Sequence, residues 1–172
     1  MTNRFAAAIL LAGAVSLGAC AKKAPEQLPP SPTETAAPDA GLDTGPAGPV
    51  LGTQEHFAEA VGTQNTVVYF DTDRFNIDED DMTKLQAQAA YFSQNSALTF
   101  TVEGHADERG TREYNLALGE RRANAAKNYL VSLGIPESRI RTLSYGKERP
   151  VALGSDESAW ALNRRAATVV IN

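Results

Sequence analysis

Cysteine is nearly absent from this sequence, which has one, Cys20, among 172 residues. A single cysteine can close no internal disulfide and has no companion for a thiolate metal site, so both common structural roles of cysteine are excluded. Histidine is also scarce, with two residues, so a zinc site would have to rely on carboxylates, an uncommon set of zinc ligands. Basic residues number 16 against 21 acidic ones, and the net charge of −5 argues against nucleic acid as a partner.

A membrane-spanning run is missing from the N-terminus, where the apolar stretch Phe5–Leu17 is too short to cross the ~30 Å hydrocarbon core as a stable helix. We therefore predict a secretion signal at residues 1–19. It ends in Leu17–Cys20 (LGAC), which resembles a bacterial lipobox because small residues precede the cysteine. We expect Cys20 to carry lipid after cleavage, the alternative being a plain signal peptide with a chance cysteine. Ala21, in place of an aspartate that would resemble an inner-membrane retention signal, favours the outer membrane.

Large apolar side chains are then nearly absent from residues 20–52, which are rich in Pro, Ala, Thr and Gly and hold seven of the nine prolines. Such a segment cannot build a core and acts as a semi-rigid spacer. We predict that the lipidated Cys20 and this flexible linker occupy 20–52, and that one folded domain occupies 53–172.

Regular patterns begin beyond this linker. β-branched, aromatic or alternating residues predict four strands, and apolar residues at helical spacing predict two helices between them. The expected strands are 66–70, 98–103, 139–145 and 166–171, and the expected helices are 79–95 and 112–133. The order β-α-β-α-β-β implies an α/β fold of the α+β sandwich type, a mixed sheet covered by helices mainly on one face.

A charged loop bracketed by glycines, Gly104–Thr111, lies between the second strand and the longer helix. On that helix Arg122 falls within an apolar stripe, between Leu118 and Ala126. A guanidinium on a buried face must be paired, must reach out along its aliphatic stem, or must meet an anionic ligand, and Asp107 is the nearest candidate partner. Two interpretations stay open, a structural Asp107–Arg122 bridge and a ligand site. In a ligand site, replacing Arg122 with alanine could even stabilise the fold, because it removes a charge from an apolar stripe.

Several spaced motifs carry a resemblance to a known family. They are Val68–Asp71 (VYFD), Glu103–Thr111 (EGHADERGT), Tyr114–Ala123 (YNLALGERRA), Ser144–Pro150 (SYGKERP) and Asn163–Ala166 (NRRA). Residues 67–171 thereby resemble the periplasmic domain of the outer-membrane-protein-A (OmpA) family, and the preceding lipobox is shared with its lipid-anchored members. The chain departs from the common pattern at Thr72, where many relatives have an aromatic residue, and at Ala106, where many have threonine.

The resemblance implies a peptidoglycan-binding site with no cofactor besides the lipid. Asp107 and Arg122 would hold the ammonium and the carboxylate at the side-chain end of meso-diaminopimelate in the stem peptide. Contacts to the same ligand are implied for five further residues: Phe70, Asp71, Arg109, Asn115 and Leu118. The family likeness also implies a partner, the periplasmic β-propeller protein of the Tol system (TolB), and a role in fastening the outer membrane to the wall and supporting the envelope during division.

Two other classes of function remain as alternatives. A wall hydrolase could use His105 with Asp107 and Glu108, although no nucleophile motif such as Gly-x-Ser-x-Gly is present. A pure protein-interaction module is the second. We expect this chain not to be an enzyme. Three residues outside the site are expected to have structural roles: Trp160 to pack, and Arg164 and Arg165 to pair with the acidic surface.

Overall fold

Within residues 48–171, which are the residues described by the computed structural model, four strands form one mixed sheet in the order β1-β4-β2-β3. The strands are β1 Val67–Tyr69, β2 Phe100–His105, β3 Ile140–Gly146 and β4 Arg165–Val170. The helices are α1 Gln54–Val61, α2 Glu79–Gln94, α3 Arg112–Ser132 and α4 Glu157–Asn163. The predicted signal, Cys20 and most of the predicted linker lie outside the described residues. No helix in the described range is long and apolar enough to cross a membrane.

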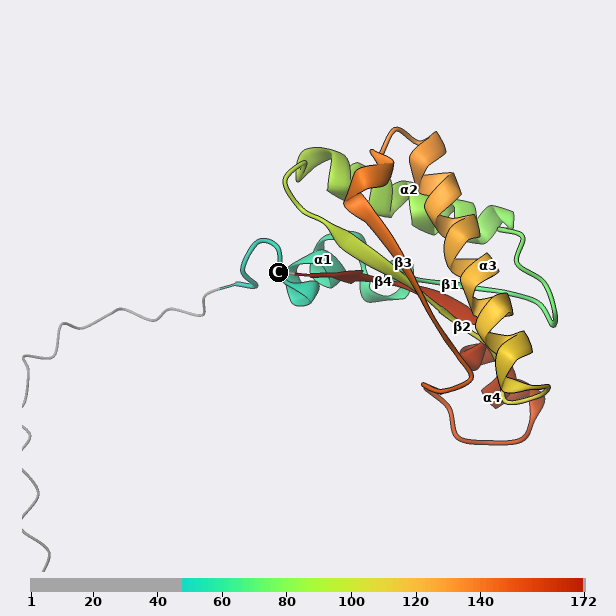
Figure 1. Cartoon of the computed structure of the whole chain (residues 1–172). Coiled ribbons are helices and arrows are strands. Elements are labelled where there is room, and N and C mark those ends of the chain that lie inside the picture. The colour runs from blue at the N-terminus through green and yellow to red at the C-terminus, as the bar shows by residue number, and fades with distance from the viewer. Residues whose placement is uncertain (1–47, 172) are drawn as a thin grey trace, which may run out of the picture. The chain divides into compact units, whose positions relative to one another are not determined.

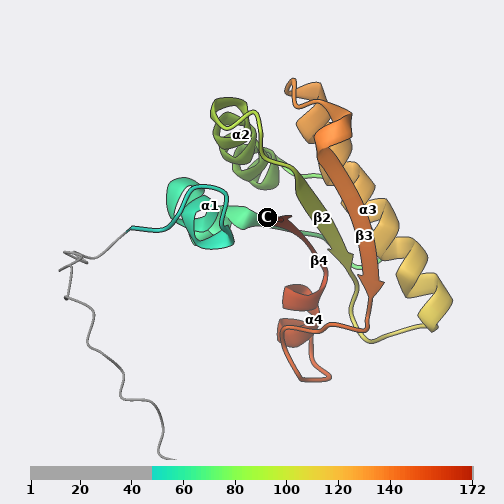
Figure 2. The same ribbon diagram turned by 60° about the vertical axis from the view of Figure 1, so that its left-hand side comes forward.

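The C-terminal ends of three strands meet at one edge of the sheet. β4 is antiparallel to both β1 and β2, whereas β2 and β3 are parallel and are joined through α3. β1, β2 and β3 therefore all run the same way, so the loops that follow them meet at one edge of the sheet. The short helix α4 lies at this edge, just before β4 begins (Figures 1 and 2).

Helices α2 and α3 pack against one face of the sheet and against each other. The core between them is aromatic: the rings of Phe92 on α2 and Phe100 on β2 stack with centroids 3.7 Å apart. α3 approaches β2 closely because two glycines face each other, Gly104 and Gly119, and a Cβ on Gly104 would overlap the carbonyl oxygen of Gly119. Because of this close approach, Arg122, about one turn further along α3, lies close to the edge of the sheet where β1 and β2 end.

The predicted α/β architecture is confirmed, including all four strands and both longer helices. Two short helices were missed. α1 and α4 have 8 and 7 residues, too few to show a helical period clearly. Both begin at a side-chain cap, Thr53 for α1 and Asp156 for α4, which accepts a hydrogen bond from the backbone N–H three residues further along the chain.

Candidate functional site

The residues predicted to bind a ligand gather at the edge where β1 and β2 end, but at different depths. Asp107 and Arg109 line an open pocket of about 250 Å³, together with Thr72, Asp73, Gly110 and Tyr114. Phe70 and Asp71 line a neighbouring pocket of about 320 Å³, whose other residues include Arg164 and Leu162. The remaining three predicted residues, Asn115, Leu118 and Arg122, are buried and line neither pocket.

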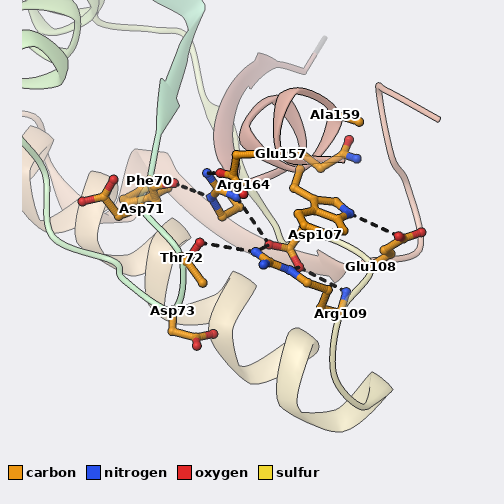
Figure 3. Close-up of polar contacts among 12 residues, drawn as sticks. Phe70, Asp71, Thr72, Asp73, Asp107, Glu108, Arg109, Glu157, Ala159 and Arg164 are labelled. Carbon is orange, nitrogen blue, oxygen red and sulfur yellow. Dashed lines mark hydrogen bonds and ion pairs between the residues drawn. The ribbon is translucent and has the colours of Figure 1, made fainter. Parts of the chain in front are cut away.

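The carboxylate of Asp107 lines the first pocket and is held by two arginines (Figure 3). Its Oδ1 accepts hydrogen bonds from the backbone N–H and the Nε–H of Arg109, both at 3.1 Å, and its Oδ2 accepts one from Nη2 at 2.7 Å. The Nη1 atom of Arg164 lies 3.6 Å from Oδ2. Burial alone would raise the pKa of Asp107, but the hydrogen bonds and charge of Arg109, with the charge of Arg164, hold it below its usual value. Asp107 is therefore an anion at neutral pH.

Arg122 is completely buried and bonds to main-chain carbonyl groups. Its Nε, Nη1 and Nη2 atoms donate to the carbonyl oxygens of Arg74, His105 and Asp71 at 2.9, 2.8 and 3.0 Å. Burial lowers the pKa of Arg122 to about 10, with Asp107 opposing the shift, so the guanidinium stays charged at neutral pH. Its positive charge thus lies at the floor of the site.

The structural Asp107–Arg122 bridge that the sequence left open is replaced by other contacts of the same two residues. Asp107 and Arg122 make no ion pair in the described part of the chain, where the basic partner of Asp107 is Arg109, with Arg164 next to it. Arg122 does pin α3 to the loops after β1 and β2, but through carbonyl oxygens. Asn115 has a related positioning role, since its side-chain amide donates to the carbonyl oxygen of Arg109 at 2.7 Å.

Trp160 on α4 forms one wall beside this pocket, a role that the sequence reading missed. The guanidinium of Arg109 lies 4.1 Å from the centroid of the Trp160 ring, and its Nη2 atom is 3.3 Å from the hydroxyl of Thr72. The indole N–H of Trp160 in turn donates to Glu108 at 3.1 Å. No sequence pattern had placed α4 near the loop after β2, because that neighbourhood depends on the strand order.

Arg164 was also expected to have a surface role, whereas the structure buries it between the two pockets with 6% of its surface exposed. Its Nε–H donates to the carbonyl oxygen of Phe70 at 2.9 Å, and its Nη2 meets Glu157 at 2.6 Å. It does pair with acids, but one of them is Asp107 at the centre of the site. For Arg165 the expected acidic partner is wrong: its Nη2 donates to the main-chain carbonyl of Arg149.

His105, the base that a hydrolase would need, is buried away from the two carboxylates assigned to it. Burial, with the charges of Arg165 and Arg149, lowers the pKa of His105 to about 4. Neither ring nitrogen has a hydrogen-bond partner among the described residues, and the nearest acid is Glu103, 3.8 Å from Nε2. The described residues also contain no cluster of three His, Cys, Asp or Glu side chains that could hold a metal ion. This geometry does not support the hydrolase alternative, because a general base must reach the proton that it takes.

Comparison with known proteins identifies relatives for most of the chain. Residues 69–165 match the OmpA family. The peptidoglycan-associated lipoprotein of Agrobacterium fabrum is 46% identical over 164 residues, covering 95% of this chain and 86% of that protein. The protein of the same description from Haemophilus influenzae is 39% identical over 165 residues, covering 95% and 97%.

Solved structures agree with this fold. The crystal structure of the peptidoglycan-associated lipoprotein from Burkholderia pseudomallei is 43% identical, has a TM-score of 0.60, and covers 62% of this chain and 90% of that one. The C-terminal domain of Helicobacter pylori MotB, at 18% identity and a TM-score of 0.58, covers 62% of this chain and 84% of that chain and shares the fold alone.

Proposed function

Because the chain belongs to the OmpA family, among its peptidoglycan-associated lipoproteins, we propose that it binds peptidoglycan and fastens the outer membrane to the cell wall. The binding site is the edge of the sheet where β1 and β2 end. Lipid on Cys20 supplies the membrane anchor, and residues 20–52 space the domain from the membrane. Many anchored copies facing a polymer of repeated stem peptides gain effective concentration, so modest affinity at each site is sufficient.

The observation that carries this proposal is the ionised carboxylate of Asp107, which lines an open pocket together with Arg109 and has Arg164 close to its Oδ2 atom. Asp73 is the second acid of that pocket. The free end of diaminopimelate has one ammonium and one carboxylate, and its recognition needs an anion and a cation a few ångströms apart. Asp107 receives the ammonium. The carboxylate meets guanidinium groups, with Arg122 supplying positive charge from the floor of the site and Arg109 from its wall.

The other proposed contacts follow from position. The carbonyl group of Phe70 and the exposed carboxylate of Asp71 border the neighbouring pocket, where the rest of the stem peptide can extend. Asn115 and Leu118 are both buried on α3, and Asn115 holds the loop after β2 in place through its bond to Arg109. We assign Leu118 to the packing of the same helix. We assign no cofactor to the site.

A protein partner fits the same edge of the sheet. Apolar side chains are exposed on the segment between β3 and α4 and on α4 itself: Val151, Leu153 and Leu162. Exposed apolar residues beside a polar cleft are typical of protein contacts. We propose that TolB, the Tol-system β-propeller, docks here and competes with the wall, and that this exchange supports the envelope during division. Pull-down with wall material, with and without that protein, tests the competition.

The central experiment is co-sedimentation of the full chain, in detergent, with purified peptidoglycan of the diaminopimelate type and of the lysine type. Asp107→Asn keeps an oxygen acceptor for the Arg109 backbone but removes the anion, so wall binding should fall by at least about tenfold while the melting temperature stays close to wild type. Asp80→Asn, an exposed change on α2, is the matched control. If Asp107→Asn sediments with the wall as wild type does, the assigned site is wrong.

A further inference from the structure

The carboxylate of Asp107 is already paired with two cations in this structure. Both of its oxygens accept hydrogen bonds from Arg109, and Arg164 lies against one of them. A ligand ammonium that pairs with Asp107 therefore competes with these guanidinium groups for the carboxylate. Arg164 is held in place by Phe70 and Glu157, and its side chain is 7% exposed, whereas the side chain of Arg109 is 39% exposed. Arg109 is thus the group that can move.

The surroundings of Arg109 hold its guanidinium in the pocket even when it leaves Asp107. The ring of Trp160 lies 4.1 Å away and the hydroxyl of Thr72 is 3.3 Å away, and neither contact involves Asp107. A guanidinium keeps its attraction to an aromatic face without a carboxylate partner. Its planar fork then presents paired N–H groups to the pocket, the geometry that suits a carboxylate.

Arg122 offers no such fork to a ligand in this arrangement. It has no exposed surface, and each of its three nitrogen atoms already donates to a main-chain carbonyl oxygen. Direct contact with a ligand would require the loops after β1 and β2 to release it. Among the arginines around Asp107, Arg109 is the most exposed, and it is the one that lines the open pocket.

We infer that Arg109 determines the selectivity of the cleft for a zwitterionic ligand by exchanging ion-pair partners. In the free cleft its guanidinium pairs with Asp107. When the ligand ammonium takes Asp107, the guanidinium stays on Trp160 and pairs with the ligand carboxylate. If the ligand has an ammonium and a carboxylate, every charged group is still paired after the exchange. A ligand with the ammonium alone leaves Arg109 without an anionic partner. This inference rests on the proposed function and adds the residue that reads the carboxylate of diaminopimelate.

Two soluble stem tripeptides test the exchange, L-Ala-γ-D-Glu-meso-diaminopimelate and its counterpart ending in L-Lys, which keeps the side-chain ammonium but lacks the carboxylate. Their affinities for the full chain in detergent are measured by calorimetry. Wild type should prefer the first peptide by at least about tenfold. In Arg109→Ala the first affinity should fall and the second should hold or rise, because Asp107 is no longer occupied, so the ratio should approach one.

The control is Arg112→Ala, which removes an exposed arginine that pairs with Glu148 beyond the pocket and should leave the ratio unchanged. Thermal melts of each variant show that it is folded. If Arg109→Ala weakens both peptides by the same factor, Arg109 is an ordinary contact; if it strengthens both by the same factor, Arg109 only blocks the site. If both affinities stay at their wild-type values, another group binds the carboxylate. Each result overturns the inference and leaves the proposed function standing. Failure of wild type to bind either peptide overturns both.

Discussion

Arg122 on α3 donates a hydrogen bond of 3.0 Å to the main-chain carbonyl oxygen of Asp71, which lies 51 residues earlier in the chain. The same guanidinium bonds to the carbonyl oxygens of Arg74 and His105. One side chain thus ties α3 to the ends of both β1 and β2. The loops that form the walls of the pocket are held at a fixed separation by this contact.

Replacing Arg122 with alanine should therefore destabilise the fold, by about 3–5 kcal/mol, because three carbonyl oxygens, that of His105 in a buried position, lose their donor and the buried side chain leaves a cavity. Chemical denaturation of the full chain measures this free energy of unfolding. Arg121→Ala, which removes the exposed neighbour on the same helix, is the control and should change stability by less than about 1 kcal/mol. Equal stability of the two variants would contradict the clamping role of Arg122.

The close contact between α3 and β2 makes a second prediction. Gly104→Ala places a methyl group on the carbonyl oxygen of Gly119, a backbone atom that cannot rotate away. We expect a loss of about 1–3 kcal/mol, together with weaker wall binding because α3 and Arg122 are pushed off the sheet. Gly48→Ala meets no atom within 4 Å and serves as the control. A Gly104→Ala protein with the wild-type melting temperature would show that the two elements are farther apart.

His105 should make the stability of the domain depend on pH. Its pKa is about 4 in the folded state against an ordinary value of 6.5, so between these two values the unfolded chain binds a proton that the folded chain does not. The free energy of unfolding should therefore fall as the pH drops from 6.5 to 4, by about 3 kcal/mol from this group, and this contribution should change no further below pH 4.

A comparison of variants separates the contribution of His105 to this pH dependence from that of the carboxylates. His105→Phe keeps a ring beside Tyr145 but cannot bind the proton, so its melting temperature should fall less than that of wild type between pH 7 and pH 4. His56→Gln, a change at the other histidine, should follow wild type. A parallel decline of wild type and His105→Phe would rule out His105 as the source.

The proposed anchor is tested at Cys20. Cys20→Ser removes the only thiol in the sequence, so the chain should no longer be acylated and should leave the membrane fraction. The measurement is membrane fractionation after a salt wash, with the peptidoglycan digested beforehand so that wall binding cannot hold the protein. A serine variant that still sediments with outer membrane would contradict lipid attachment at this residue.

The strand and helix patterns of the sequence predicted most of the fold, because alternation and helical spacing are local properties. The stripe on α3 also placed Arg122 on a buried face, and the structure confirms that burial. The short helices α1 and α4 could not be predicted in the same way, since a segment of 7 or 8 residues shows barely two turns. Because α4 was not predicted, the position of Trp160 beside the pocket was not predicted either.

The sequence by itself determined the class of fold, the charged loop after β2 and the burial of one arginine, since each depends on residues close together in the chain. Which groups meet was decided only by the tertiary structure. The strand order β1-β4-β2-β3 brings Arg164 and Trp160 beside Asp107, more than 50 residues away in the chain. It also gives Arg122 three carbonyl partners in place of Asp107 and leaves Arg109 on that carboxylate, because a guanidinium bonds to whichever acceptors the packed backbone places within its reach.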